Sequence, residues 1–294
     1  MSPQSTDCLI CKGKTVFKEY CRKENYLLLR CETCNFIFVP EESLTGISLN
    51  DFYNQNYLRN SSGGGYVDYE LDKVPMRPVY EKLLQTVQTL GSGESLLDIG
   101  TASGYFLDIA SNYGYKSSGI DINLSAVREG LGLGRNIKHG DLFTHDFEDS
   151  SVDVITALDF IEHLPYNQVN LFLKKVRTAL SEKGIFVLIT VNTGSLWARF
   201  WQTNWHTLLP PEHLSYFSDR NIKLLLENNG FKVLKIKTLH KFFSLQYIFS
   251  ILYRWQKLSL WKSLTKFLEF NPLLGRIKLK ISIGDNVLIV ARKI

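Results

Sequence analysis

Two pairs of cysteines have a spacing that predicts metal chemistry. Each Cys-x-x-Cys pair can turn two thiolates toward one ion, and two such pairs complete the tetrahedral four-sulfur shell of a structural zinc site, which leaves no position for a catalytic water. A segment this short could hardly pack a core without such a metal. We therefore expect a zinc-ribbon module over residues 1–45. Its four ligands are Cys8, Cys11, Cys31 and Cys34.

The rest of this segment is typical of a scaffold. Hydrophobic runs at Tyr26–Arg30 and Phe36–Val39 predict two ribbon strands. Cys21 has no partner at matching spacing, so we expect a spare thiol there. Zinc ribbons can bind nucleic acid, but this one lacks a dense basic and aromatic patch. We expect it to support the structure, and we do not expect a nucleic-acid partner.

A glycine-containing turn is the second feature with chemical potential. It reads Asp98-Ile-Gly-Thr-Ala-Ser-Gly104 and follows a short apolar strand. Gly100 and Gly104 let the backbone turn sharply and approach a ligand, while a helix after the turn presents free amides to a carboxylate. Asp121 closes the next strand, where its carboxylate can accept both hydroxyls of a ribose. Together these residues predict a nucleoside-containing cofactor.

A nicotinamide enzyme is the natural competitor, because it also has a glycine turn and an acidic residue after the second strand. The dinucleotide fingerprint requires G-x-G-x-x-G. Here three residues separate Gly100 from Gly104, with Ala102 between them. The spacing of the glycines therefore argues against a dinucleotide.

An alternation of helices and short apolar strands must position these residues, and it predicts a parallel α/β sheet. Functional residues of such a sheet belong at the carboxyl ends of its strands. The polar residues that interrupt the pattern fall at those ends. We expect helices over 76–90 and 105–113, and strands over 95–99, up to 121, near 139, and over 152–157, 184–190, 231–237 and 286–292.

Four motifs together resemble those of class I S-adenosylmethionine (SAM)-dependent methyltransferases. They are Asp98–Gly104, Gly119–Asn123, Gly140–Leu142 and Leu158–Leu164. The resemblance runs through about residues 75–240 and ends in the strand at 286–292, which resembles the final antiparallel strand of the family. It implies a Rossmann-like seven-stranded sheet with helices on both faces, and SAM as the cofactor.

The resemblance also assigns cofactor-binding residues by their positions in these motifs. It places Asp98, Gly100 and Gly104 around the methionine end of SAM, Asp121 on the ribose, Ile122 against the adenine, Asp141 and Leu142 at the adenine edge, and Leu158 on the pocket floor. Ala102 stands where the family more often has glycine, and we expect SAM binding to survive this small side chain.

A polar and aromatic loop, Pro211–Ser218, precedes a helix for which Ser218 is the expected N-cap. It resembles the Glu-His-x-x-Tyr-Phe-Ser signature of ubiquinone-type O-methyltransferases and zinc-bearing deoxysugar C-methyltransferases. His213 can accept a proton during methyl transfer, and Glu212 can orient it or act as the base. The alternative is that His213 only ties the loop to backbone carbonyls, because in-line positioning alone can carry methyl transfer. For His163 we expect a mainly structural role.

Segments outside the sheet bear on the acceptor. Residues 46–74 are expected to form a linker and lid segment, and 75–294 the methyltransferase domain, with a helical insertion at 241–280. Two amphipathic helices within 241–270 either cover the substrate cleft or dock on a membrane surface. An aromatic lid is predicted from Tyr53, Tyr57, Tyr66 and Tyr69.

The charge is unevenly distributed. Residues 232–294 contain 13 Lys and Arg against only Glu269 and Asp285, a net charge of +11 that leaves −6 for residues 1–231. This asymmetry fits an anionic partner or a solvated basic face. The N-terminus lacks the pattern of a secretory signal and no apolar run reaches the length of a membrane span, so we expect a cytoplasmic location.

The sequence thus predicts a SAM-dependent methyltransferase acting on an oxygen or carbon atom of a small or carrier-linked metabolite. The resemblance favours a nucleotide-activated or surface-polysaccharide sugar. An RNA or tRNA methyltransferase is one alternative, although neither Asn-Pro-Pro-Tyr nor a nucleophilic cysteine follows the fourth strand. A non-catalytic zinc- and SAM-binding module is the other. The sequence predicts no oligomeric state.

Overall fold

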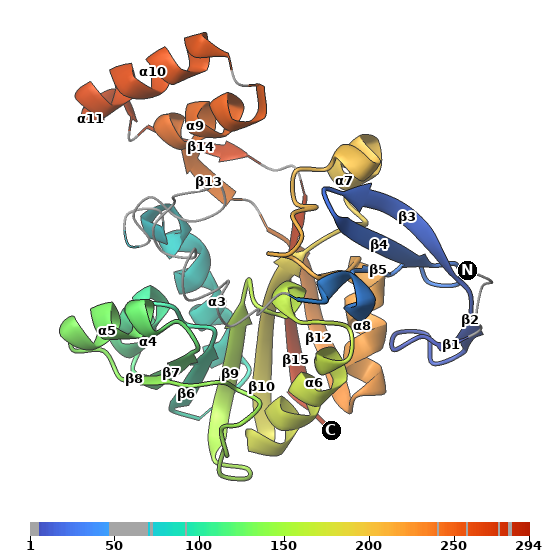
Figure 1. Cartoon of the computed structure of the whole chain (residues 1–294). Helices are drawn as coiled ribbons and strands as arrows, with labels where there is room; N and C mark the ends of the chain where they lie inside the picture. Colours follow the sequence, from blue (N-terminus) through green and yellow to red (C-terminus); the bar gives the residue numbers. More distant parts are fainter. Residues whose placement is uncertain are drawn as a thin grey trace.

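A seven-stranded sheet runs through the centre of the protein (Figure 1). The structure, a computed structural model, describes residues 6–46, 70, 73–91, 93–239, 241–256, 258–275, 277–281 and 284–294. In spatial order the strands are β12 (Phe231–Thr238), β15 (Asn286–Lys293), β10 (Leu180–Val191), β9 (Val152–Leu158), β6 (Ser95–Ile99), β7 (Lys116–Asp121) and β8 (Ile137–His139).

All strands from β10 to β8 are parallel, whereas β15 is antiparallel to both of its neighbours. The expected mostly parallel α/β sheet with an antiparallel closing strand is therefore confirmed. The chain builds outward from β6 through β7 to β8 and then returns to place β9 on the other side of β6. The order of strands thus reverses beside β6, which is where ligands bind in open parallel sheets.

Helices cover both faces of the sheet because its strands bury alternate side chains on opposite sides. Leu96 packs on the face covered by α3 (Arg77–Thr89), α4 (Tyr105–Asn112) and α5 (Leu124–Gly132). Its neighbour Leu97 packs on the other face, with α6 (Gln168–Ala179) and α8 (Asp219–Asn228). The nearly continuous burial of β9 and β10 is what a strand covered on both faces requires.

The N-terminal segment forms a four-stranded sheet that a distant part of the chain completes. Strands β3 (Phe17–Lys23), β4 (Tyr26–Cys31) and β5 (Ile37–Phe38) are consecutive, and both expected ribbon strands are present among them. The fourth strand, β11 (Ser215–Tyr216), belongs to the loop that carries Glu212 and His213, and it pairs antiparallel with β5. A short pair, β1 (Thr6–Asp7) and β2 (Lys14–Thr15), flanks the first cysteine pair.

Tyr166 joins this N-terminal sheet to the sheet-and-helix body. Its ring lies 4.4 Å from that of Phe38 and also contacts Phe17 and Phe36. Its hydroxyl accepts a hydrogen bond from the Leu9 amide at 2.9 Å and donates one to the Asp7 carbonyl at 3.1 Å. Burial raises the pKa of Tyr166 to about 12. The core of the N-terminal segment is thus continuous with the core beneath α6 and α8.

The expected insertion helices form as α9 (Leu245–Gln256) and α10 (Ser259–Phe270). Asn271 follows the last residue of α10, and Pro272 begins a short helix, α11 (Pro272–Gly275), because proline fits the first position of a helix. The sequence did not indicate the two-stranded ribbon of β13 (Lys241–Ser244) and β14 (Lys278–Ile281), which closes the insertion at its base. The four expected lid tyrosines lie outside the described residues.

Shorter helices complete the chain. They are α7 (Leu196–Trp201) and the 3₁₀ turns η1 (Glu41–Leu44), η2 (Val74–Met76), η3 (Ile161–His163) and η4 (Gln202–Asn204). Ser218 caps α8 as expected, and a reciprocal bond from the Ser218 amide to the Asn221 side chain completes a capping box. Among the helices that the structure describes, none combines the length and the apolar character needed to cross a bilayer.

The contacts of Tyr166 generate a stability prediction. Tyr166→Phe removes two hydrogen bonds but keeps the ring, so we expect a loss of about 1–3 kcal/mol in the free energy of unfolding. Tyr166→Ala also opens a cavity among three phenylalanines and should cost about 3–5 kcal/mol. Urea titrations followed by fluorescence measure both values. Equal losses for the two variants would contradict the role assigned to the ring.

Candidate functional site

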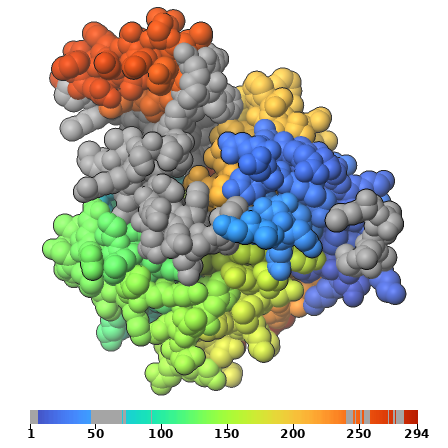
Figure 2. All heavy atoms as spheres, viewed as in Figure 1, coloured from blue at the N-terminus to red at the C-terminus, as the bar shows by residue number. Residues whose placement is uncertain are grey.

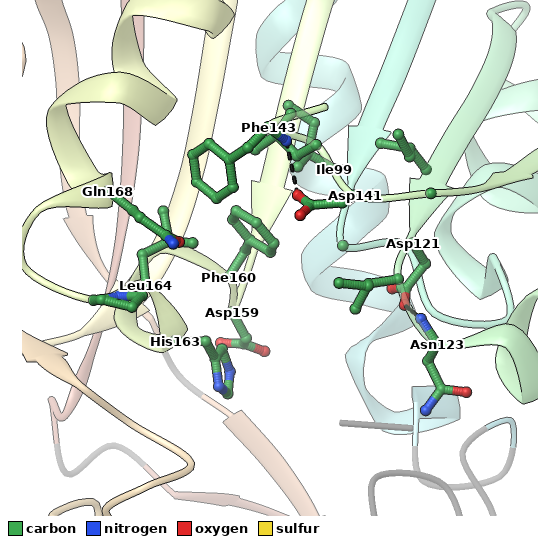
Figure 3. A pocket seen from close by; sticks show the side chains of 16 residues that line it. Ile99, Asp121, Asn123, Asp141, Phe143, Asp159, Phe160, His163, Leu164 and Gln168 are labelled. Atoms are coloured by element: carbon green, nitrogen blue, oxygen red, sulfur yellow. Dashed lines mark hydrogen bonds between the residues drawn. The ribbon is translucent and has the colours of Figure 1, made fainter. Parts of the chain in front are cut away.

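A pocket lies at the carboxyl ends of β6, β7, β8 and β9, where the strand order reverses. Figure 3 shows side chains from all four strand ends facing one space. Five of the expected cofactor residues line it: Gly100, Asp121, Ile122, Asp141 and Leu142. Their neighbours at the ends of β6, β7 and β8 also line it, and a further wall comes from residues 159–168, which follow β9.

The turn after β6 depends on left-handed backbone conformations. Gly100 and Gly104 have φ values of +74° and +86°, which glycine adopts without steric cost. A Cβ atom at Gly100 would lie 2.4 Å from the ring of Phe160, so a side chain there would displace a wall of the pocket. Ala102 also has positive φ, at +51°, where most side chains are strained. Its amide donates a 2.7 Å hydrogen bond to Asp121, which holds the turn in place.

Two carboxylates of the pocket are fixed by backbone amides. Asp121 accepts hydrogen bonds from the amides of Ala102 and Asn123, at 2.7 and 2.8 Å. Burial raises the pKa of Asp121, and the two amide bonds act in the opposite direction. Asp141 likewise accepts a bond from the Phe143 amide at 2.8 Å (Figure 3). The pocket therefore presents two oriented acceptors beside the apolar side chains of Ile122 and Leu142.

Three expected cofactor residues lie near the pocket but not on its lining, and their assignment stays a prediction. Asp98 is 3% exposed and accepts a 2.5 Å hydrogen bond from the Thr156 hydroxyl. Burial raises the pKa of Asp98 to about 7. Gly104 is the N-cap of α4 and packs against Ile137. Leu158 faces the core under α3 and α4, and the residues after it line the pocket instead.

Asp159 is a pocket residue that the sequence reasoning missed. It follows β9 directly, has a φ of +57°, and lines the pocket together with Phe160. The ammonium of Lys73, itself 6% exposed, lies 3.6 Å from its carboxylate. The available signal was the polar residue directly after a buried strand. Lys73 carried no such signal, because it lies in the segment that precedes the sheet.

A charged network connects Glu70, which precedes α3, with the glycine turn and α4. The guanidinium of Arg135 binds both carboxylate oxygens of Glu70, at 2.6 and 3.0 Å, and also binds Asp108 at 2.6 Å. The Ser103 hydroxyl donates to Glu70 at 2.5 Å. Burial alone would raise the pKa of Glu70, but the bonds from Arg135 and Ser103 lower it. Glu70 is thereby tied to the turn and to α4.

Two histidines meet where the Glu212–His213 loop reaches the pocket. His163 lines the pocket, and its ring centroid lies 4.9 Å from that of His213. His163 Nδ1 donates to the carbonyl of Glu212 at 2.6 Å, and His213 Nδ1 donates to the carbonyl of Thr207 at 2.9 Å. In both neutral rings Nε2 is then the nitrogen that can accept a proton. Burial lowers the pKa of His163, so this ring stays neutral at pH values at which an ordinary histidine is already protonated.

The four cysteines of the N-terminal segment converge as expected. Their Sγ atoms all lie within 4.8 Å of one another. Cys8 and Cys34 are 3.7 Å apart at sulfur, and Cys11 and Cys31 are 3.9 Å apart. Four sulfurs at about 2.3 Å from one ion in a tetrahedron are separated by about 3.8 Å, so the cluster has the dimensions of a four-thiolate zinc site. Cys21 lies outside the cluster, on β3.

Comparison with known proteins identifies the family. Residues 71–236, more than half of the chain, match the family described as "Methyltransferase domain". This range contains the pocket and both histidines, but not the four-cysteine cluster or the insertion helices.

Two characterised or named relatives are similar in sequence. The sphingolipid C9-methyltransferase of Komagataella phaffii is 26% identical over 209 residues, which cover 64% of this chain and 40% of that protein. A probable SAM-dependent methyltransferase of Mycolicibacterium smegmatis is 26% identical over 156 residues, which cover 52% of this chain and 58% of that protein. The matches thus span about half the length of these relatives.

Solved structures confirm the fold. A SAM-dependent methyltransferase from Archaeoglobus fulgidus has a TM-score of 0.52 at 21% identity, covering 76% of this chain and 99% of that one. The PH0226 protein from Pyrococcus horikoshii has a TM-score of 0.52 at 15% identity, covering 85% and 100%. With the match over residues 71–236, these findings show that the chain belongs to the methyltransferase-domain family.

Proposed function

We propose that this protein transfers a methyl group from SAM to an oxygen or carbon atom of a small or carrier-linked metabolite, with a sugar as the favoured acceptor. The observation that carries the proposal is the pocket at the strand reversal. There Gly100 lets the ring of Phe160 pack against the turn and form one wall, and Asp121 and Asp141 present oriented carboxylates.

The pocket suits SAM in both shape and chemistry. Asp121 at the end of β7 can accept the ribose hydroxyls, while Ile122 and Leu142 offer apolar contact to an adenine ring. Asp98 would lie beneath the cationic methionine end, where a carboxylate is favourable. When bound, SAM supplies an electrophilic methyl group on its sulfonium. The protein then has to orient the acceptor and, for a hydroxyl or an activated carbon, remove its proton.

We assign proton removal to His213, with Glu212 and His163 as its neighbours. Two observations support this assignment. The carbonyl of Thr207 holds the Nδ1 proton of His213, which leaves Nε2 as the basic nitrogen. The neighbouring ring of His163 is kept neutral by burial, so it does not repel a proton that arrives on His213. The Glu212 backbone fixes the orientation of His163.

We infer the acceptor class from the contact between the N-terminal sheet and the loop that carries Glu212 and His213. Pairing of β11 with β5 makes the loop of Glu212 and His213 part of the N-terminal sheet. The sheet thus positions this loop, whose His213 contacts the pocket residue His163, and we infer that the sheet takes part in substrate selection. The name of the relative from Komagataella phaffii describes methylation of a carbon atom in a lipid, which is consistent with a carrier-linked acceptor.

We further propose that the four cysteines bind one structural zinc ion. The distances between their sulfur atoms fit a tetrahedral shell, and Cys8 and Cys31 are buried. With all four positions taken by thiolates, the ion would hold the two Cys-x-x-Cys pairs of the N-terminal segment together.

For the insertion we propose docking on an anionic membrane surface. Large apolar side chains of α10 and α11 are exposed, among them Phe270 at 85% and Leu273 at 91%. Exposed Lys262 and Lys266 lie on the same helix as Phe270, and residues 232–294 carry a net charge of +11. Figure 2 shows α10 as a projection at one end of the molecule. Aromatic and aliphatic side chains beside lysines are the composition of interfacial helices.

The Gly100 position tests the cofactor site. Gly100→Ala adds a Cβ that meets Phe160, so we expect the Kd for SAM, measured by calorimetry, to rise about ten-fold or more. Gly114→Ala is the matched control, because its φ is also positive, at +86°, but no atom lies within 4 Å of its Cβ. Failure of the unaltered protein to bind SAM would contradict the proposed function. An equal effect of both substitutions on binding would contradict the placement of the cofactor.

The histidine pair predicts a pH-dependent turnover. With radiolabelled SAM and a panel of nucleotide-linked sugars, His213→Gln should lower kcat by about 10²–10⁴-fold while the Kd for SAM stays unchanged. Protonation of Nε2 abolishes its action as a base, so kcat should fall as the pH is lowered. If His163 is the base instead of His213, the fall in kcat should occur below pH 6.5, because burial lowers the pKa of His163 from that value. An unchanged kcat in His213→Gln would leave positioning as the source of catalysis.

Metal analysis tests the cysteine cluster. We expect one zinc ion per chain in freshly purified, reduced protein, and a loss of most of it in Cys31→Ser. Cys21→Ser removes a thiol of the same sheet that lies outside the cluster, so it should retain the full zinc content. Substoichiometric zinc in the unaltered protein, together with an unchanged melting temperature in Cys31→Ser, would argue against the site.

Vesicle flotation tests the membrane surface. The protein should float with vesicles containing phosphatidylglycerol and much less with pure phosphatidylcholine, and Phe270→Ser with Leu273→Ser should abolish flotation. The control pair is Leu196→Ser with Phe200→Ser, because these side chains of α7 are 82% and 76% exposed. If the α10–α11 variant instead disrupts a dimer in light scattering, the surface binds a second copy and the proposal is overturned.

A further inference from the structure

A second and larger cavity, of about 700 Å³, lies between the N-terminal sheet and the body of the protein. Its walls come from four parts of the chain: the N-terminal sheet with one cysteine of each pair, Cys11 and Cys34; residues 193–194 after β10; α7 with η4 and the residues that follow; and the beginning of α8. Figure 1 shows α7 beside β3 and β4, and α8 next to them. The cavity is distinct from the cofactor pocket, since the two share no lining residue.

Three arginines give this cavity a positive charge. Arg30 comes from β4, Arg199 from α7 and Arg220 from α8, and the described lining residues include no Asp or Glu. In the part of the chain that the structure describes, none of the three guanidinium groups forms an ion pair. All three arginines are exposed, and three cations around one cavity without a carboxylate attract an anion.

The helix terminus beside the cavity adds little to this charge, because its donors are already used. The first amides of α8 donate to the side chains of Asn192, Asp219 and Ser218. A different donor is left over. Trp205 lines the cavity at 2% exposure, and its indole N–H has no acceptor among the described residues. This nitrogen has almost no accessible surface, so it faces packed side chains and not the cavity, and Trp205 contributes only apolar ring surface to the lining.

The cavity has room for more than a phosphate. Its volume lies within the range of about 300–1,000 Å³ that is typical of small-molecule sites. Tyr20, whose ring lies 5.5 Å from the Arg30 guanidinium carbon, and Leu208 add aromatic and apolar surface beside the arginines. A planar or apolar group attached to an anion can therefore bind in the same space.

The cavity also adjoins the proposed base. Leu208 lines it, and the preceding carbonyl, that of Thr207, holds Nδ1 of His213. His213 in turn contacts His163, which lines the cofactor pocket. The segment 207–213 thus connects Leu208 in the cavity lining with His213, which contacts the cofactor pocket through His163. A ligand anchored at the arginines can present its other end to His213 and to the cofactor pocket.

We propose that this cavity binds the diphosphate group of the methyl acceptor, through Arg30, Arg199 and Arg220. The inference rests on the proposed function and names its acceptor class: a metabolite carried on a diphosphate. Both a nucleoside diphosphate and a prenyl diphosphate share this chemistry. Bidentate arginine contacts to phosphate oxygens supply the affinity, and the aromatic surface accommodates the carrier.

Calorimetric titrations of the full chain with UDP, dTDP, GDP, farnesyl diphosphate and inorganic pyrophosphate test the proposal. We expect at least one carrier diphosphate to bind more tightly than pyrophosphate, and the Arg199→Gln/Arg220→Gln variant to weaken it ten-fold or more. The control, Arg22→Gln/Lys223→Gln, removes the same charge from β3 and α8 outside the cavity. SAM affinity should be unchanged in both variants.

The outcomes separate this inference from the proposed function. Intact SAM binding with no diphosphate binding overturns the cavity assignment alone, whereas loss of SAM binding in the unaltered protein overturns the proposed function. Equal weakening by the arginine and control variants also overturns the assignment, because it indicates a nonspecific charge effect.

Discussion

The reversal of strand order beside β6 is the constraint on which the cofactor pocket depends. Because β7 and β9 lie on opposite sides of β6, the loops that leave these strands diverge and open a space between them. Four residues around this space, Gly100, Ala102, Gly104 and Asp159, have left-handed backbone conformations. Each non-glycine residue among them costs about 1–2 kcal/mol. The hydrogen bond from Ala102 to Asp121 and the ion pair of Asp159 with Lys73 offset part of that cost.

A second dependence links the N-terminal sheet to catalysis. The loop of Glu212 and His213 has no regular partner in the central sheet, and its position is set by β11 pairing with β5 and by the Leu214 amide donating to the Glu162 carbonyl. The Asn221 side chain also donates to the carbonyl of Cys34. Any loss of order at the cysteine cluster would therefore reach the proposed base through backbone hydrogen bonds.

Local patterns in the sequence sufficed for most of the central sheet. Short apolar runs and the turn residues after them predicted β6 to β10, β12 and β15, and the side chains at their carboxyl ends predicted much of the pocket lining. For Leu158 the prediction depends on one residue of register, because the described pocket lining begins with Asp159 and Phe160, and its place on the pocket floor stays a prediction. The pairing of β5 with β11 could not be predicted, since a two-residue strand has no periodicity.

Long-range electrostatic contacts were equally invisible in the sequence. The network of Glu70, Arg135 and Asp108 joins three segments whose charges look like ordinary surface charges when read along the chain. The arginines of the second cavity come from three different elements, and nothing in their local sequence relates them. The four cysteines were different: their contact could be predicted from the sequence, because the Cys-x-x-Cys spacing is a requirement of metal binding and not of the fold.

The late position of β11 has a consequence for biosynthesis. Strands β3, β4 and β5 leave the ribosome long before Ser215 and Tyr216 are translated, so the nascent N-terminal sheet has an open edge at β5. An unpaired edge strand is a template for association with other chains, and contacts this distant in sequence form slowly. Binding of the proposed zinc ion by the two Cys-x-x-Cys pairs would rigidify the sheet during this interval. The edge at β5 would stay exposed until the methyltransferase core has been synthesised.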